Sequence, residues 1–251
     1  MRAILIALAL LLAAAGGYAL KEFAVARNSA EAPTSISVDQ QISQYLKAHP
    51  DEVLAALKQA QANSEKQQQA EAHQALELKQ DQIFNNPADP VVGNVKGDVT
   101  VVEFFDYRCP YCKRVTDALA ELLKGDPNIR LVYKDFPILG PDSVVAAKIA
   151  LAAQRQGKYE AVHTAFMGHK GSFEESALLE LAASVGADPT KLAADMQDPA
   201  ILGQLQANDS LAAALGITGT PGFLFGKQLV PGAVSLDDMK KLVSEARAQA
   251  G

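Results

Sequence analysis

Two cysteines separated by two residues are the only cysteines in this 251-residue chain. Cys109 and Cys112 form a Cys-Pro-Tyr-Cys motif. In such a pair, one thiolate can attack a disulfide bond, and the neighbouring thiol can then displace whatever the first sulfur has captured. The spacing therefore favours a dithiol that cycles between reduced and oxidised forms.

A zinc site and a structural disulfide are the alternative interpretations of the pair. Zinc needs about four Cys or His ligands at matched spacing. The histidines form no such motif with the cysteines: His49, His73, His163 and His169. A disulfide that closes so short a loop removes little chain entropy, so it would stabilise the fold poorly. Redox cycling is the favoured interpretation.

The segments on either side of the motif explain how the sulfurs would be held. Residues 99–105 form a near-continuous apolar run typical of a central strand. A helix is predicted to begin at Pro110, which suits a first helical turn. The free amides and positive dipole of that turn would favour a thiolate at Cys109. Nearby cations would add to this effect if they face the sulfur: Arg108, Lys113 and Arg114.

Glu103 is the one charged residue in the predicted strand. A buried carboxylate costs free energy unless it is paired or its pKa is raised. Because Glu103 lies six residues before Cys109, we expect it beneath the cysteine pair, where it would exchange protons with the resolving thiol of Cys112. The alternative is a glutamate at an exposed sheet edge.

The remaining pattern predicts an α/β domain. A short strand is expected at Val91–Val92, a second long strand at 129–133 in a parallel crossover, a hairpin at 223–230 and a last helix at 236–248 capped by Ser235. Five helices are expected between the long strands and the hairpin: 142–156, 158–167, 172–185 with a Ser172–Glu175 capping box, 189–196 and 199–215. His163 and His169 are expected at the surface.

The N-terminal third has a different organisation. Residues 1–26 resemble a signal peptide or an uncleaved signal anchor, so we expect export to a periplasm, with tethering to the inner membrane as the alternative. A linker is expected at 27–37 and a helical arm at 38–86. The arm is either a spacer or an oligomerisation element, with apolar ends at 38–57 and 76–84. The net charge of −6 and the lack of a basic stripe argue against a nucleic-acid partner.

The proposed catalytic domain, residues 87–251, resembles the DsbA family of thioredoxin-fold thiol–disulfide oxidoreductases over roughly Pro90 to Ala248. The resemblance is carried by Phe-Phe-Asp-Tyr-Arg-Cys-Pro-Tyr-Cys at 104–112, by Phe-Pro-Ile-Leu-Gly-Pro at 136–141, and by the Thr-Pro loop that follows a helical insertion at about 141–216. It implies a thioredoxin fold preceded by a helical arm.

The same resemblance assigns roles to individual residues. Cys109 would be the attacking thiolate, Cys112 the resolving thiol and Glu103 the buried carboxylate. Thr220 and Pro221 would form a cis-proline loop whose backbone binds an extended polypeptide substrate. The active-site motif would include Arg108, Pro110 and Tyr111.

Two positions differ from the strongly oxidising monomeric members of the family. Tyr111 stands where those proteins have His, and Thr220 where they have Val. Losing the imidazole should make the disulfide less oxidising. Together with the arm, these differences make the chain most similar to the ScsC-type (suppressor of copper sensitivity) branch and favour an isomerase or reductase.

The resemblance also implies the partners of the protein. No organic cofactor is needed, and a membrane thiol–disulfide partner would recycle the cysteine pair. Cysteine-containing polypeptides would be the substrates, and the protein would form a homo-oligomer through residues 38–86. Two alternatives are open: a monomeric dithiol oxidase, and a copper(I)-binding or chaperone module in which the two sulfurs are soft ligands.

Overall fold

The computed structural model describes residues 37–250. The chain divides into two compact units, with the boundary between Ala62 and Asn63. The expected export segment, residues 1–26, lies outside the described residues. Within residues 37–250, no helix has the length and apolar character needed to cross a membrane.

The first unit is helical. Helix α2 (Val38–Ala48) begins with a capping box between Ser37 and Gln40, and helix α3 (Pro50–Leu78) begins after the predicted break at His49. Every residue of α2 is exposed. Six large apolar side chains of this unit are each at least 49% exposed: Val38, Ile42, Tyr45, Leu46, Leu54 and Leu57.

The second unit is built on a five-stranded sheet with the order β1-β3-β2-β4-β5. Its strands are β1 (Val91–Gly93), β2 (Val99–Phe105), β3 (Ile129–Asp135), β4 (Gly222–Phe225) and β5 (Gln228–Pro231). Strands β2 and β3 are parallel, and the other neighbours are antiparallel. The predicted central strand is therefore confirmed, because β2 lies in the middle and is buried on both faces.

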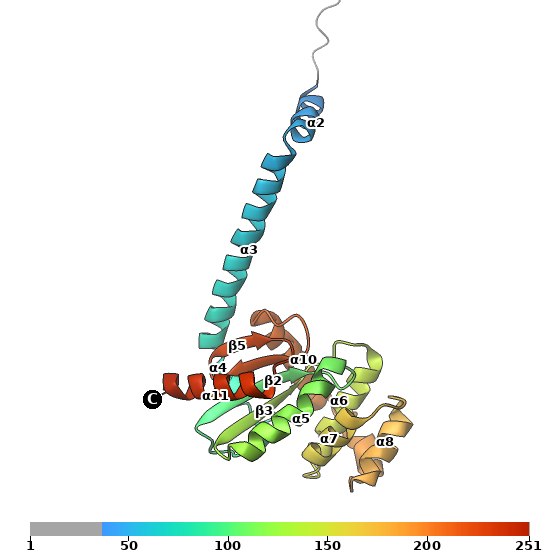
Figure 1. Cartoon of the computed structure of the whole chain (residues 1–251). Helices are drawn as coiled ribbons and strands as arrows, with labels where there is room; N and C mark the ends of the chain where they lie inside the picture. Colours follow the sequence, from blue (N-terminus) through green and yellow to red (C-terminus); the bar gives the residue numbers. More distant parts are fainter. Residues whose placement is uncertain (1–36, 251) are drawn as a thin grey trace, which may run out of the picture. The chain divides into compact units, whose positions relative to one another are not determined.

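Helices α5 (Pro110–Gly125) and α11 (Leu236–Ala250) cover one face of the sheet and contact each other (Figure 1). The predicted helical insertion is also present between β3 and β4. It comprises α6 (Pro141–Gln154), α7 (Tyr159–Gly168), α8 (Glu175–Ser184), α9 (Pro189–Asp195) and α10 (Pro199–Ala214). The predicted capping box at Ser172 is wrong, because the Ser172 hydroxyl accepts from the amide of Glu174 in a turn and α8 begins only at Glu175.

The opposite face of the sheet is covered by the end of α3 and by the short helix α4 (Gln80–Phe84). Leu76 and Ile83 are buried there in one apolar cluster with Val102, Phe104 and Leu224. Leu76 and Ile83 of the apolar end at 76–84 therefore pack within their own chain, whereas Leu78 is 75% exposed. Pairing of this end with copies of itself stays a prediction.

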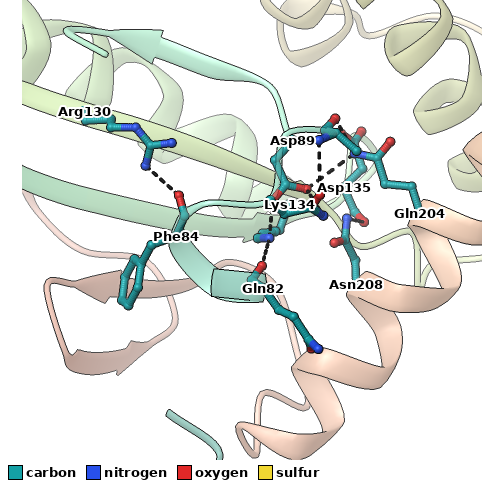
Figure 2. A network of polar contacts seen from close by, with 10 residues as sticks. Gln82, Phe84, Asp89, Arg130, Lys134, Asp135, Gln204 and Asn208 are labelled. Carbon is teal, nitrogen blue, oxygen red and sulfur yellow. Dashed lines mark hydrogen bonds and ion pairs between the residues drawn. The ribbon is translucent and has the colours of Figure 1, made fainter. Parts of the chain in front are cut away.

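Two cations from β3 fix α4 to this face, as Figure 2 shows. Lys134 is fully buried, pairs with the carboxylate of Asp89 and donates to the carbonyl of Gln82. Arg130 donates to the carbonyl of Phe84 over 2.7 Å. Both carbonyls belong to α4, whose C-terminal end favours positive charge. Removing one member of a buried pair of this kind costs about 3–5 kcal/mol, because the other charge stays buried without its partner.

Candidate active site

The cysteine pair lies where the central strand runs into a helix. Strand β2 ends at Phe105, a three-residue turn follows, and Cys109 caps the N-terminus of α5 with Pro110 in the first helical turn. Cys112 lies in that same first turn. Both cysteines are free thiols, with Cys109 4% exposed and Cys112 fully buried. The predicted position of the pair at a helix N-terminus is confirmed.

The loop before β4 approaches the first sulfur. The thiol of Cys109 donates to the backbone carbonyl of Thr220 over 3.2 Å, and the Thr220–Pro221 peptide bond is cis, as the resemblance implies. Pairing of Phe104 with Gly222 in the sheet brings these two segments together. Cys109 therefore faces a backbone edge that an extended peptide could approach.

Glu103 is buried beneath the pair. It is 1% exposed and is flanked in the sheet by Tyr133 on β3 and Phe223 on β4. Its Oε1 atom has no hydrogen-bond partner among the described residues. Burial, and to a smaller extent the charge of Cys109, raise the pKa of Glu103 to about 8. This agrees with the buried interpretation and excludes the exposed-edge alternative.

The second sulfur is held as a thiol. Burial and the nearby carboxylate of Glu103 raise the pKa of Cys112 far above its ordinary value, against the opposing effect of a hydrogen bond from the backbone of Asp106. A resolving thiol in this environment needs a base before it can attack a mixed disulfide. Glu103 is the titratable carboxylate whose charge acts on it.

The three neighbouring cations have other partners. Arg108 donates to the carbonyl of Leu139 over 2.9 Å and lies 3.6 Å from Asp142. Lys113 binds the carbonyl of His169 and lies over the ring of Phe173. The Arg114 guanidinium stacks on the Tyr111 ring at 4.4 Å. The structure therefore gives each of them a contact of its own rather than a direct bond to Cys109.

The surface beside the pair carries exposed apolar side chains. Tyr111 is 52% exposed, and Ile138 and Leu139 in the loop after β3 are 40% and 44% exposed. The bond from Arg108 to the Leu139 carbonyl holds this loop next to the active-site turn. Apolar contact area is thus available to a partner that brings a disulfide to Cys109.

His163 does not lie at the surface as the sequence-based expectation has it. It is buried on α7, and its Nδ1 atom lies 3.2 Å from the hydroxyl of Tyr107, two residues before Cys109. Burial lowers the pKa of His163 to about 3, so the ring is neutral. A histidine on an otherwise apolar helix face, Val162 to Phe166, was the available sign of burial.

Asp106 is the residue of the site that sequence analysis did not single out. Its carboxylate is buried and accepts hydrogen bonds from the amides of Arg108 and Leu139 and from the Ser143 hydroxyl, at 2.7, 2.9 and 2.8 Å. The bond to Arg108 is an Asx turn, which an aspartate directly after a strand often forms. The other two donors are more than thirty residues away, and no local pattern reveals them.

Comparisons with known proteins agree with this geometry. A family model described as a DSBA-like thioredoxin domain matches residues 100–244. A thioredoxin-like oxidoreductase from Silicibacter pomeroyi is 48% identical, with a TM-score of 0.65 over 67% of this chain and 97% of that one. The catalytic domain of Proteus mirabilis ScsC is 29% identical, with a TM-score of 0.65 over 70% and 98%.

Curated relatives include both short and long proteins. The thiol:disulfide interchange protein DsbA of Bordetella parapertussis is 31% identical over 58% of this chain and 71% of its own length. The chain spans about a quarter of the length of the Na(+)/H(+) antiporters NhaA from Salinispora that it matches at 28–30% identity. From the family match, the 48% identical structure and the predicted thioredoxin fold that they confirm, we conclude that the chain belongs to the DSBA-like thioredoxin domain family.

Proposed function

We propose that this protein is an exported thiol–disulfide oxidoreductase that exchanges disulfides with cysteine-containing polypeptides. The observation that carries the proposal is the pair itself. Cys109 is at the helix N-terminus beside the backbone carbonyl of Thr220, and Cys112 is buried behind it over a carboxylate whose pKa is about 8. Membership of the DSBA-like family supports the same activity.

The exchange proceeds in two displacements. The Cys109 thiolate attacks one sulfur of a substrate disulfide, which forms a mixed disulfide and releases the other substrate sulfur as a thiolate. Cys112 then loses its proton to the Glu103 carboxylate and attacks the Cys109 sulfur. The substrate leaves with two thiols, and the protein keeps the Cys109–Cys112 disulfide. The reverse sequence oxidises a substrate dithiol and reduces the protein.

Isomerase or reductase activity is favoured over dedicated oxidation. Position 111 is a tyrosine, which is exposed and stacked with Arg114. Because it is not a histidine, no imidazole at this position stabilises a thiolate at Cys109. A disulfide that is less strongly oxidising is better suited to rearranging wrong pairings than to making new ones. A reducing thiol–disulfide partner in the membrane would keep the pair reduced. The pattern of residues 1–26 supports export to a periplasm.

The arm is proposed to hold copies of the chain together. We keep the domain boundaries proposed from the sequence, an arm at 38–86 and a catalytic domain at 87–251. Most of the exposed apolar surface of the arm lies within residues 38–57. Six large apolar side chains stay exposed there along α2 and the start of α3. An exposed apolar stripe on a helix is suited to pairing with other helices of its kind.

One experiment tests both parts of the proposal on the full chain without residues 1–26. We expect the protein to be an oligomer by light scattering, to reduce insulin, and to restore activity to scrambled ribonuclease. Leu46→Lys and Leu54→Lys should yield monomers that still reduce insulin but lose most of the isomerase activity, because lysine cannot be buried in a helix interface without a partner. Ala55→Lys, on the other side of α3, is the matched control.

Other results would support the alternatives. A monomeric protein that oxidises reduced peptides but does not rearrange scrambled ribonuclease would be a dithiol oxidase. Tight, stoichiometric copper(I) uptake with negligible insulin reduction would indicate a metal-binding module, since paired thiolates are soft ligands. Oligomers that persist in the Leu46→Lys and Leu54→Lys variants would refute the proposed role of the arm but leave the thiol–disulfide activity untouched.

A further inference from the structure

We propose that Asp106 is a positioning residue for the cysteine pair, and that its carboxylate sets the redox equilibrium of the pair through the turn that it holds. The inference rests on the proposed function, since it concerns how readily the two sulfurs cycle. It adds a residue that makes no contact with substrate and acts through the geometry of Cys109 and Cys112.

The backbone of Asp106 contacts both cysteines. Its carbonyl accepts from the amide of Cys109 over 3.0 Å, and its own amide donates toward the sulfur of Cys112. The first bond closes the turn that presents Cys109. The second is stronger when Cys112 is a thiolate, because a charged acceptor strengthens a hydrogen bond. The two peptide units on either side of the Asp106 Cα therefore act on the amide of Cys109 and on the sulfur of Cys112.

The side chain of Asp106 fixes these two peptide units to three parts of the fold. It is 1% exposed, and its partners lie in its own turn, in the loop after β3 and at the start of α6. Helix α6 begins at Pro141 with Gly140 as its cap, so the carboxylate also lies near the positive end of that helix. Three hydrogen bonds to one buried side chain hold the turn in a single arrangement.

A carboxylate is the side chain that this position requires. All three partners are donors: the amides of Arg108 and Leu139 and the hydroxyl of Ser143. An asparagine has nearly the same shape but only one oxygen, so its amide nitrogen would face a donor, most simply that of Leu139. Asp106→Asn therefore loosens the turn while it preserves the volume of the side chain.

The loosened turn should stabilise the disulfide form relative to the dithiol form. In the reduced protein the sulfur of Cys112 receives the hydrogen bond of the Asp106 amide, whereas a disulfide sulfur is a poor acceptor. Losing this bond destabilises the reduced state more than the oxidised state. The protein should then become a weaker oxidant than the wild type.

The test measures the equilibrium of the cysteine pair with glutathione for Asp106→Asn and Asp106→Ala, with Asp89→Asn as the matched control. Asp89 is also a buried carboxylate, but it pairs with Lys134 on the opposite face of the sheet (Figure 2). All three variants should lose stability. The Asp106 variants should shift the equilibrium constant toward the protein disulfide by roughly fivefold to tenfold, and Asp89→Asn by less than about twofold.

Ser143→Ala keeps the inference testable if the Asp106 variants do not fold, since it removes one donor and leaves the carboxylate in place. It should shift the equilibrium in the same direction by roughly twofold to threefold. A shift in Asp106→Asn no larger than in Asp89→Asn, a shift toward the dithiol, or a Ser143→Ala protein that loses stability without any shift would each overturn the inference. If the wild-type pair does not equilibrate with glutathione at all, the proposed function itself fails.

Discussion

Replacing Cys109 by alanine should reduce disulfide exchange to the background rate. The first displacement needs a sulfur that an incoming disulfide can reach. Cys109 keeps 4% of its surface exposed and faces the Thr220 carbonyl, at the backbone edge proposed to bind peptide, whereas Cys112 has no exposed surface. Burial also raises the pKa of Cys112, so the remaining thiol in this variant is a poor nucleophile at neutral pH. Insulin reduction by the purified variant measures the loss.

The matched variant is Cys112→Ala, which keeps the attacking sulfur and removes the resolving one. It should still form mixed disulfides, and these should accumulate because nothing inside the protein displaces the captured substrate. Mass spectrometry after incubation with a disulfide-bonded peptide should find the adduct on Cys109. Adducts on Cys112 in the Cys109→Ala variant, formed at a comparable rate, would reverse the assignment of the two sulfurs.

Replacing Glu103 by glutamine should slow the release of substrate from the mixed disulfide by roughly a hundredfold or more, the usual contribution of a positioned general base. The pKa of Glu103 is about 8, so in the wild type the fraction of carboxylate, and with it the rate, should rise between pH 7 and 9. Glutamine cannot accept the proton of Cys112 at any pH. Stopped-flow measurement of the single-turnover rate across this range tests both statements.

The same substitution should raise the stability of the folded protein although it slows the reaction. The pKa of Glu103 is raised from 4.5 to about 8 by folding, so its unfavourable contribution is absent below pH 4.5 and complete above pH 8. In the wild type, the free energy of unfolding should therefore fall as the pH rises through this window. At pH 8, Glu103→Gln should be more stable by about 4 kcal/mol, and at pH 4.5 by little.

This opposition separates a catalytic role from a structural one. A variant that is more stable but slower cannot owe its slowness to unfolding. Urea denaturation of the reduced proteins at the two pH values supplies the comparison. A Glu103→Gln protein with wild-type single-turnover rates from pH 7 to 9 would show that the carboxylate takes no part in proton transfer.

Much of the fold is encoded in local patterns. The apolar run at 99–105 is continuous because β2 is buried on both faces, and such a run identifies a central strand without knowledge of its neighbours. Proline and glycine positions fixed the helix limits of the insertion to within a few residues. Ser172 misled because a serine followed by a glutamate three residues later also fits a turn that precedes the helix.

Contacts between distant residues explain what local patterns could not reveal. Glu103 could be predicted as buried, since a lone charge in an apolar strand is costly and needs a reason. The part that Asp106 plays in the site could not be predicted, because two of its three hydrogen-bond donors come from the loop after β3 and from α6. Leu76 and Ile83 were likewise assigned to an interface between copies, because nothing in the sequence of a polar helix indicates that its last turns pack against the sheet.

The central claim is that Cys109 and Cys112 form one reversible dithiol–disulfide couple. The most direct test is to equilibrate the wild-type protein with defined ratios of reduced and oxidised glutathione, to quench by alkylation, and to measure the mass of the peptide that carries both cysteines. We predict that both thiols disappear together, as an intramolecular disulfide, along a single two-electron curve. Thiols that stay reduced at every ratio, or that form separate glutathione adducts, would contradict the account.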